Sequence, residues 1–296
     1  MQPTRREFLV SAAATLAASQ VVSPASLLAA AEPPRKFSLG LVTYNVARDW
    51  DLPSILQICD EVGIAAVECR TTHAHGVEPS LNSAQRKEAR QRFADSDTIF
   101  WGCGSTCEFH SPDANVVNQN IEDCKRFVDL VADLGGTGVK VRPNGLPKEV
   151  PVEKTLTQIG RALVECGRAA EEAGVEIWVE VHGRGTQEPA HMKTIMEACG
   201  HKSVGINWNS NPGEVKNGSV AEPFEMLRPW LRTCHINDLG NDATGKYPYR
   251  ELFRLLRASG YDRHTLIEVG TTYPDVKAGT EFLRNYKAEW DRLASA

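Results

Sequence analysis

The sequence predicts an α/β protein whose eight parallel strands close into a (β/α)8 barrel, the TIM-barrel architecture. Strand-like and helix-like segments alternate along the chain, which is typical of a parallel sheet with right-handed crossovers. Eight such pairs follow one another within residues 37–296 without a change in composition, and this favours a single barrel domain. The alternative is an open doubly wound sheet, which normally has a glycine-rich turn after its first strand. Residues 43–47 contain no glycine, so the barrel is favoured.

The first four pairs consist of short apolar runs, each followed by a segment with apolar residues every three or four positions. The expected strands are residues 36–43, 64–68, 98–102 and 138–142. The helices expected after them are residues 53–62, 83–94, 116–134 and 152–173. Gly63, Gly135 and Gly174 directly follow three of these helices, and glycine commonly ends a helix at this position.

The last four pairs follow the same pattern. One strand begins at residue 177, and the others are residues 203–208, 232–237 and 265–269. The expected helices are residues 188–199, 221–231, 249–258 and 275–293. A strand buried on both faces should be almost continuously apolar, so a polar residue near its end needs an explanation.

Residues 177–184 read Ile-Trp-Val-Glu-Val-His-Gly-Arg and contain the clearest polar break. Glu180 lies near the end of the strand, where an unpaired buried carboxylate would cost several kcal/mol. Its partner must be a protein cation, a metal ion or a substrate. Comparable breaks occur on the next three strands, at Asn209, His235 and Glu268.

The ends of barrel strands and the loops after them form the open face at which active sites lie. Two carboxylates, an imidazole and a carboxamide are therefore expected to meet there, in a set suited to Mn²⁺, Mg²⁺ or Zn²⁺. These candidate metal ligands are Glu180, Asn209, His235 and Glu268. The alternative is structural: a strand-end glutamate can pair with Lys140, Arg142 or Arg184, and a strand-end histidine can be a core residue.

Residues 1–31 resemble a twin-arginine export signal. Arg5 and Arg6 precede an apolar, alanine-rich run, and small residues at positions 29 and 31 offer a cleavage site. We expect export, for example to the periplasm, and cleavage of this segment; the alternative is an amphipathic helix that carries two arginines. No later run is long enough to span a membrane, so stable membrane insertion is not expected.

The net charge of −5 disfavours nucleic acid as a partner, because proteins that follow phosphates usually have a basic face. The eight cysteines are scattered at irregular spacing, and most are expected to be small buried apolar residues. The sequence leaves the oligomeric state open.

Three motifs resemble the xylose-isomerase-like barrel superfamily, over roughly residues 37–290. They are Glu-x-His at Glu180 and His182, His-Ile-Asn-Asp from His235, and Ile-Glu at Glu268. The export signal and the run Asn-Trp-Asn-Ser-Asn-Pro are similar to an exported sugar phosphate isomerase/epimerase group. In the superfamily the sixth strand normally ends in Asp, and this chain has Asn209 there. A neutral amide in that place implies weaker metal binding.

The resemblance implies a metal-assisted enzyme that moves a proton next to the carbonyl of a sugar or cyclitol. Glu180 and Glu268 would be its catalytic acid and base, on opposite sides of the bound sugar. The alternatives are a lyase or dehydratase of the same fold and a non-catalytic sugar-binding barrel. An endonuclease-IV-type enzyme is disfavoured by the acidic charge and the export signal.

Five further residues are candidates for binding substrate: His110, Lys140, Arg142, His182 and Trp208. Lys140 and Arg142 alternate on one strand and should share the lumen face, one in a structural ion pair and the other on the substrate. Glu68 and Arg70 repeat this spacing, and we expect a pair between them or across strands. The loop histidines His73, His75 and His110 could bind a second metal or lie at the surface, and the tryptophan could belong to the core.

Overall fold

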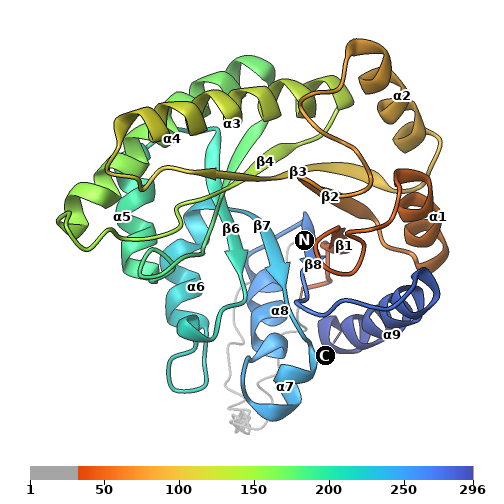
Figure 1. Ribbon diagram of the computed structural model, residues 1–296. Helices are drawn as coiled ribbons and strands as arrows, with labels where there is room; N and C mark the ends of the chain where they lie inside the picture. Colours follow the sequence, from red (N-terminus) through yellow and green to blue (C-terminus); the bar gives the residue numbers. More distant parts are fainter. Residues whose placement is uncertain (1–32, 296) are drawn as a thin grey trace, which may run out of the picture. The chain divides into compact units, whose positions relative to one another are not determined.

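Eight parallel strands close into a barrel in the order in which they occur along the chain, and β8 pairs with β1 (Figure 1). The computed structural model describes residues 33–295, so the expected export signal lies outside the described residues. The closed sheet confirms the predicted (β/α)8 fold.

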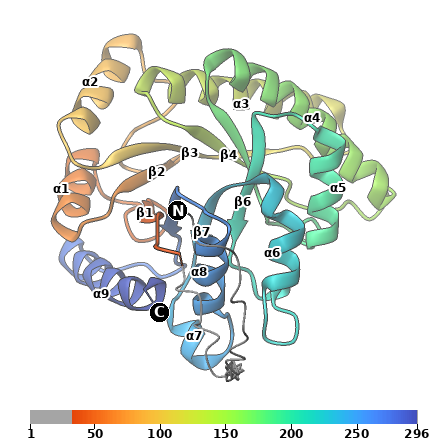
Figure 2. The same cartoon turned by 180° about the vertical axis from the view of Figure 1, so that it is seen from behind.

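The strands are short, and their carboxyl ends all lie at one face of the barrel. They are β1 Ser38–Val42, β2 Ala66–Arg70, β3 Ile99–Glu108, β4 Gly138–Arg142, β5 Glu176–Glu180, β6 Val204–Asn209, β7 Leu231–Ile236 and β8 His264–Ile267. The helices form a ring outside the strands, visible from both sides (Figures 1 and 2). They are α1 Leu52–Val62, α2 Ser83–Ala94, α3 Ala114–Leu134, α4 Val152–Ala173, α5 Pro189–Cys199, α6 Ala221–Leu227, α7 Gly240–Thr244, α8 Tyr249–Ala258 and α9 Val276–Ala294.

Most element bounds agree with the sequence expectation within a few residues, and three differ. Strand β3 continues to Glu108, six residues beyond the expected end. Helix α6 ends at Leu227, and a short 3₁₀ turn, Arg228–Trp230, leads into β7. Helix α7 was not expected, because its five residues contain no periodic apolar pattern.

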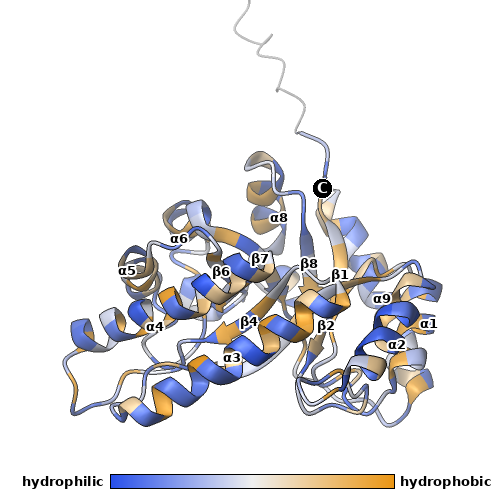
Figure 3. Cartoon of the chain, turned by 90° about the horizontal axis from the view of Figure 1, so that it is seen from above, coloured by the Kyte–Doolittle hydropathy of each residue, from blue (hydrophilic) through white to orange (hydrophobic). Residues whose placement is uncertain are grey.

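Apolar side chains pack on both faces of the closed sheet. Helices α3 and α4 carry both hydrophobic and hydrophilic residues, and their apolar side chains belong to the main core between helices and barrel (Figure 3). Inside the barrel, Trp101 of β3 stacks on Trp178 of β5 with ring centroids 5.1 Å apart. This plug packs the interior of the barrel, and the polar cavity described below lies at the carboxyl ends of the strands.

Among residues 33–295, no helix is both long and apolar enough to cross a bilayer. All eight cysteines are buried and none forms a disulfide, in agreement with their interpretation as small apolar residues.

Candidate active site at the carboxyl ends of the strands

A polar cavity of about 280 Å³ opens at the carboxyl ends of the strands. Six of the residues that the sequence singled out line it: Lys140, Arg142, Glu180, His182, Asn209 and Glu268. Four further lining side chains were not among the predicted site residues: Tyr44, Arg70, Asn211 and Asn237. The polar residues at the strand ends therefore predicted where the cavity lies, although they include only some of the residues that line it.

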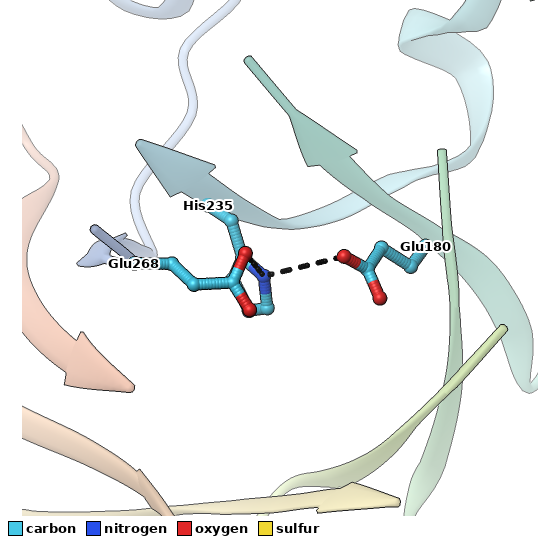
Figure 4. Close-up of side chains that lie close together, drawn as sticks. All are labelled: Glu180, His235 and Glu268. Atoms are coloured by element: carbon cyan, nitrogen blue, oxygen red, sulfur yellow. Dashed lines mark ion pairs between the residues drawn. The ribbon is translucent and has the colours of Figure 1, made fainter. Parts of the chain in front are cut away.

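Glu180, His235 and Glu268 converge from β5, β7 and the residue after β8 (Figure 4). His235 Nδ1 lies 3.2 Å from Glu268 Oε2 and 4.0 Å from Glu180 Oε1. One ligand atom from each of the three residues lies within 4.8 Å of the others, a grouping that can hold a metal ion. Three of the four predicted ligands thus meet in space.

His235 is oriented by Glu68, for which the sequence left open a pair with Arg70 or with a residue of another strand. Its Nε2 lies 3.1 Å from Glu68 Oε2 of β2, and both side chains are fully buried. A carboxylate on one ring nitrogen fixes the tautomer and leaves the other nitrogen, Nδ1, for a metal. Burial disfavours the charged ring, but Glu268 and Glu68 outweigh this effect and raise the pKa of His235 to about 10. A divalent ion at Nδ1 would therefore have to displace a proton.

Asn209 is the fourth of the predicted ligands. Its Nδ2 donates to Glu180 Oε1 over 3.0 Å, so its Oδ1 faces away from that carboxylate. This buried Oδ1 has no hydrogen-bond partner within the described part of the chain, and a buried acceptor left unpaired is costly. Its register partner on β7 is His235, so Asn209 lies beside the cluster in the sheet. Two carboxylates, an imidazole nitrogen and an amide oxygen fit a divalent ion such as Mn²⁺, Mg²⁺ or Zn²⁺.

Lys140 of β4 forms the structural ion pair. Its Nζ lies 2.8 Å from Glu180 Oε2, and the two side chains are only 2% and 3% exposed. Burial alone would raise the pKa of Glu180, but Lys140, His235 and His182 outweigh it and lower the pKa to about 2. Glu180 is therefore held as a carboxylate, which can act as a ligand or a base.

Arg142 and His182 belong to one polar chain along the cavity wall. Arg142 and Asn144 both donate to Glu108, and Asn144 Oδ1 lies 3.0 Å from His182 Nδ1. Because the Asn144 amide already donates to Glu108, His182 Nδ1 donates to Asn144 and leaves Nε2 as an acceptor. Gly183 permits this approach, since a Cβ there would come within 2.6 Å of Asn144 Cα.

Two predicted substrate-binding residues do not line the cavity. Trp208 points toward the helices: its Nε1 donates to Tyr247 Oη over 2.9 Å, and its ring packs edge-on against Phe224 of α6. His110 is half-buried beside Glu108, with 3.9 Å between its Nδ1 and the carboxylate. Trp208 thus takes the core role that the sequence analysis gave as its alternative.

Sequence reasoning left the partner of Glu68 open and missed Asn144, for different reasons. Glu68 was expected to pair with Arg70 or across strands, and it pairs with His235, from a strand far along the chain. The polar break at the end of β2 was a usable signal for Glu68. Nothing in the sequence signalled Asn144, because it lies in the loop after β4.

Comparisons with known proteins agree with this architecture. A family model described as "Xylose isomerase-like TIM barrel" matches residues 56–286. No curated protein matches the chain. Solved structures share the fold at low sequence identity, which by itself shows the fold alone.

Three of these structures cover most of the chain. A D-psicose 3-epimerase, solved in the presence of D-fructose, superposes with a TM-score of 0.72 at 16% identity and covers 88% of this chain and 100% of its own. The 3-keto-D-glucoside 4-epimerase YcjR from E. coli gives 0.71 at 14% identity, with coverage of 88% and 100%. The IolI protein with a bound zinc atom gives 0.67 at 17% identity, with coverage of 88% and 98%. Since the family model spans more than half of the sequence, the chain belongs to the xylose isomerase-like TIM barrel family.

Proposed function

We propose that this protein is a metal-assisted enzyme that transfers a proton at the carbon next to a sugar carbonyl, as an isomerase or epimerase. One observation carries the proposal: Glu180 and Glu268 flank His235 at the barrel mouth, and Asn209 is hydrogen-bonded to Glu180 beside them. The two sugar epimerases and the zinc-bound barrel among the structural neighbours support it.

The ligands of the ion would be Glu180, Asn209, His235 and Glu268. When bound there, a divalent cation would polarise the sugar carbonyl and stabilise the negative charge that develops on its oxygen. Glu180 is kept ionised by Lys140 and would remove the proton, while Glu268 would return it from the other side. His182 Nε2 would accept a hydrogen bond from a sugar hydroxyl. The plug formed by Trp101 and Trp178 closes the barrel beneath the reacting carbon.

The twin-arginine segment supports a further part of the proposal, which is that the enzyme acts after export. Replacement of Arg5 and Arg6 by lysine should retain the protein in the cytoplasm, as measured by cell fractionation and immunoblotting. Export that is unchanged by both substitutions would contradict this assignment.

Exchange of carbon-bound hydrogen tests the proposed chemistry directly. The purified protein would be incubated with Mn²⁺ and a panel of ketoses, aldoses and sugar acids in D₂O, with ¹H NMR detection. We expect at least one compound to lose the signal of the hydrogen next to its carbonyl. Glu268→Gln should abolish this exchange while the compound still binds, and Glu149→Gln, at an exposed loop position, should leave it unchanged. Absence of exchange for every compound would contradict the proposal.

The Lys140–Glu180 pair favours a second candidate, a sugar-binding barrel without catalysis. The ammonium group of Lys140 neutralises the Glu180 carboxylate without a metal ion, so the site needs no metal in order to bind a sugar. The same experiment separates the two candidates: binding without exchange in D₂O would favour the binder.

A further inference from the structure

Arg70 lines the cavity, and among residues 33–295 it has no carboxylate partner. Of the other cations there, Lys140 pairs with Glu180 and Arg142 pairs with Glu108. Within residues 33–295, Arg70 forms no ion pair, and the hydrogen bond that its guanidinium makes is a long one, 3.5 Å to the carbonyl of Thr71. An arginine is always charged and offers five donors in a fixed fork, so this side chain is available to bind an anion.

Arg70 and Glu68 lie next to each other on the cavity wall but do not form an ion pair with each other within residues 33–295. The two residues share the lumen face of β2, and the Glu68 carboxylate is directed to His235. Gly104 lies opposite Arg70 on β3. A Cβ at Gly104 would lie 2.7 Å from Glu68 Oε1 and 3.4 Å from Arg70 Cδ. The absence of a side chain at this position therefore allows both groups to occupy the cavity wall.

Both backbone polar groups of Arg70 form hydrogen bonds to side chains. Its N–H donates to Thr43 Oγ1 over 3.0 Å, and its carbonyl lies 2.9 Å from His75 Nε2. Val77 N–H donates to His75 Nδ1, so Nε2 must carry the proton that it gives to Arg70. His75 is buried, and its role as a positioning residue for Arg70 replaces both earlier interpretations, a second metal site or a surface residue.

The charge balance indicates which anion would fit. The charged side chains in the cavity wall or in contact with it are Glu68, Glu108, Glu180, Glu268, Arg70, Lys140 and Arg142. Four carboxylates face three cations, so a divalent ion bound with neutral His235 leaves one net positive charge. A carboxylate on the substrate would neutralise it, whereas a phosphate monoester carries about −1.5 to −2 at neutral pH.

We propose that Arg70 binds the carboxylate of the substrate, so that the substrate is a sugar acid that also has a sugar carbonyl, such as a uronate. This assignment rests on the proposed function, because it takes the same cavity as the sugar site. A guanidinium and a carboxylate form two parallel hydrogen bonds, which fix the orientation of the sugar relative to Glu180 and Glu268.

Calorimetric binding tests the assignment independently of turnover. D-Glucuronate, D-galacturonate and D-mannuronate would each be compared with the parent hexose and its 6-phosphate, with and without Mn²⁺. At least one uronate should bind about tenfold or more tightly than its hexose, since hydrogen bonds between charged groups are stronger than those between neutral groups. Arg70→Gln should remove this preference, Arg70→Lys should keep part of it, and Arg168→Gln, on the exposed side of α4, should not change it. Rising salt should weaken uronate binding to the wild type and leave hexose binding unchanged.

The proposal is overturned if no uronate binds the wild type more tightly than its hexose, or if Arg70→Gln weakens both ligands equally. A 6-phosphate that binds more tightly than every uronate would also overturn it. Hydrogen exchange in D₂O separates this failure from that of the proposed function: exchange on neutral sugars alone contradicts the sugar-acid assignment only. Arg70-dependent uronate binding without exchange contradicts the catalytic proposal only.

Discussion

Glu68 Oε2 lies 3.1 Å from His235 Nε2, and this contact joins β2 to β7 within the barrel. It determines which nitrogen of the imidazole faces Glu180 and Glu268. Neither residue is exposed to solvent, so no water competes for the bond. Glu68 is accordingly a positioning residue for the proposed metal site.

Loss of the Glu68 acceptor should weaken metal binding. Glu68→Leu leaves His235 Nε2 without a partner, and such changes typically lower metal affinity about 10- to 100-fold. Competition with a chelator would measure the affinity for Mn²⁺ or Zn²⁺. Glu68→Gln is the matched control, because its amide oxygen still accepts from Nε2 and should retain most of the affinity. Equal affinity of Glu68→Leu and the wild type would contradict the positioning role.

A carboxylate at position 209 should strengthen metal binding. Asn209→Asp adds a negative charge to the ligand cluster, and we expect the affinity to rise about tenfold or more. Without metal the variant should melt at a lower temperature than the wild type, because the new carboxylate replaces a donor to Glu180. Thermal denaturation with and without Mn²⁺ measures both effects. Asn118→Asp, on an exposed part of α3, should show neither of them, and an unchanged Asn209→Asp affinity would exclude Asn209 as a ligand.

The buried pair of Lys140 and Glu180 should couple strongly in folding. Lys140→Met leaves the Glu180 carboxylate unpaired and should lower the free energy of unfolding by about 3–5 kcal/mol. The double variant Lys140→Met/Glu180→Gln should recover much of this loss, since it buries no uncompensated charge. Urea denaturation of the wild type, both single variants and the double variant gives the coupling energy. Additive single effects would show that the two residues do not interact as described.

Glu214 should make stability depend on pH. Burial raises the pKa of its carboxyl well above the usual value, and hydrogen bonds from Tyr247 and Asn211 only partly offset this. Because the pKa is raised in the folded state, the contribution of this group to the free energy of unfolding is fully present below about pH 4.3. As the pH rises toward the folded-state pKa, this contribution falls by up to about 1.4 kcal/mol per pH unit. Glu214→Gln should therefore gain stability relative to the wild type between pH 4 and pH 7 in urea denaturation. A difference that does not vary with pH would contradict an uncharged Glu214.

The fold was predictable because the alternating elements and their glycine ends are local signals. The site was predictable where strand ends broke an apolar pattern, as at Glu180, Asn209 and His235. Trp208 was named as a substrate-binding candidate without applying alternation: neighbouring strand residues face opposite sides, so it does not share the lumen with Asn209. The structure follows this rule, with Trp208 packed against α6.

Other relationships were beyond the sequence because they depend on closure in three dimensions. Glu68 could pair with Arg70 or with a distant strand, and only the barrel brings His235 within reach. As a consequence Arg70 has no ion-pair partner among the residues that the structure describes, so its availability could not be predicted either. Likewise, the hydrogen bonds of Asn144 and His75 arise from loops whose paths no periodic pattern specifies.

The metal content of the protein is the decisive measurement for the proposed site. Elemental analysis of the folded, purified protein should find close to one divalent ion, Mn, Mg or Zn, per chain. Glu268→Gln, which removes a charged ligand, should lose most of this metal, whereas Glu149→Gln should retain it. A wild-type protein that is metal-free, and whose melting temperature does not change on addition of any of the three ions, would contradict the metal-assisted account.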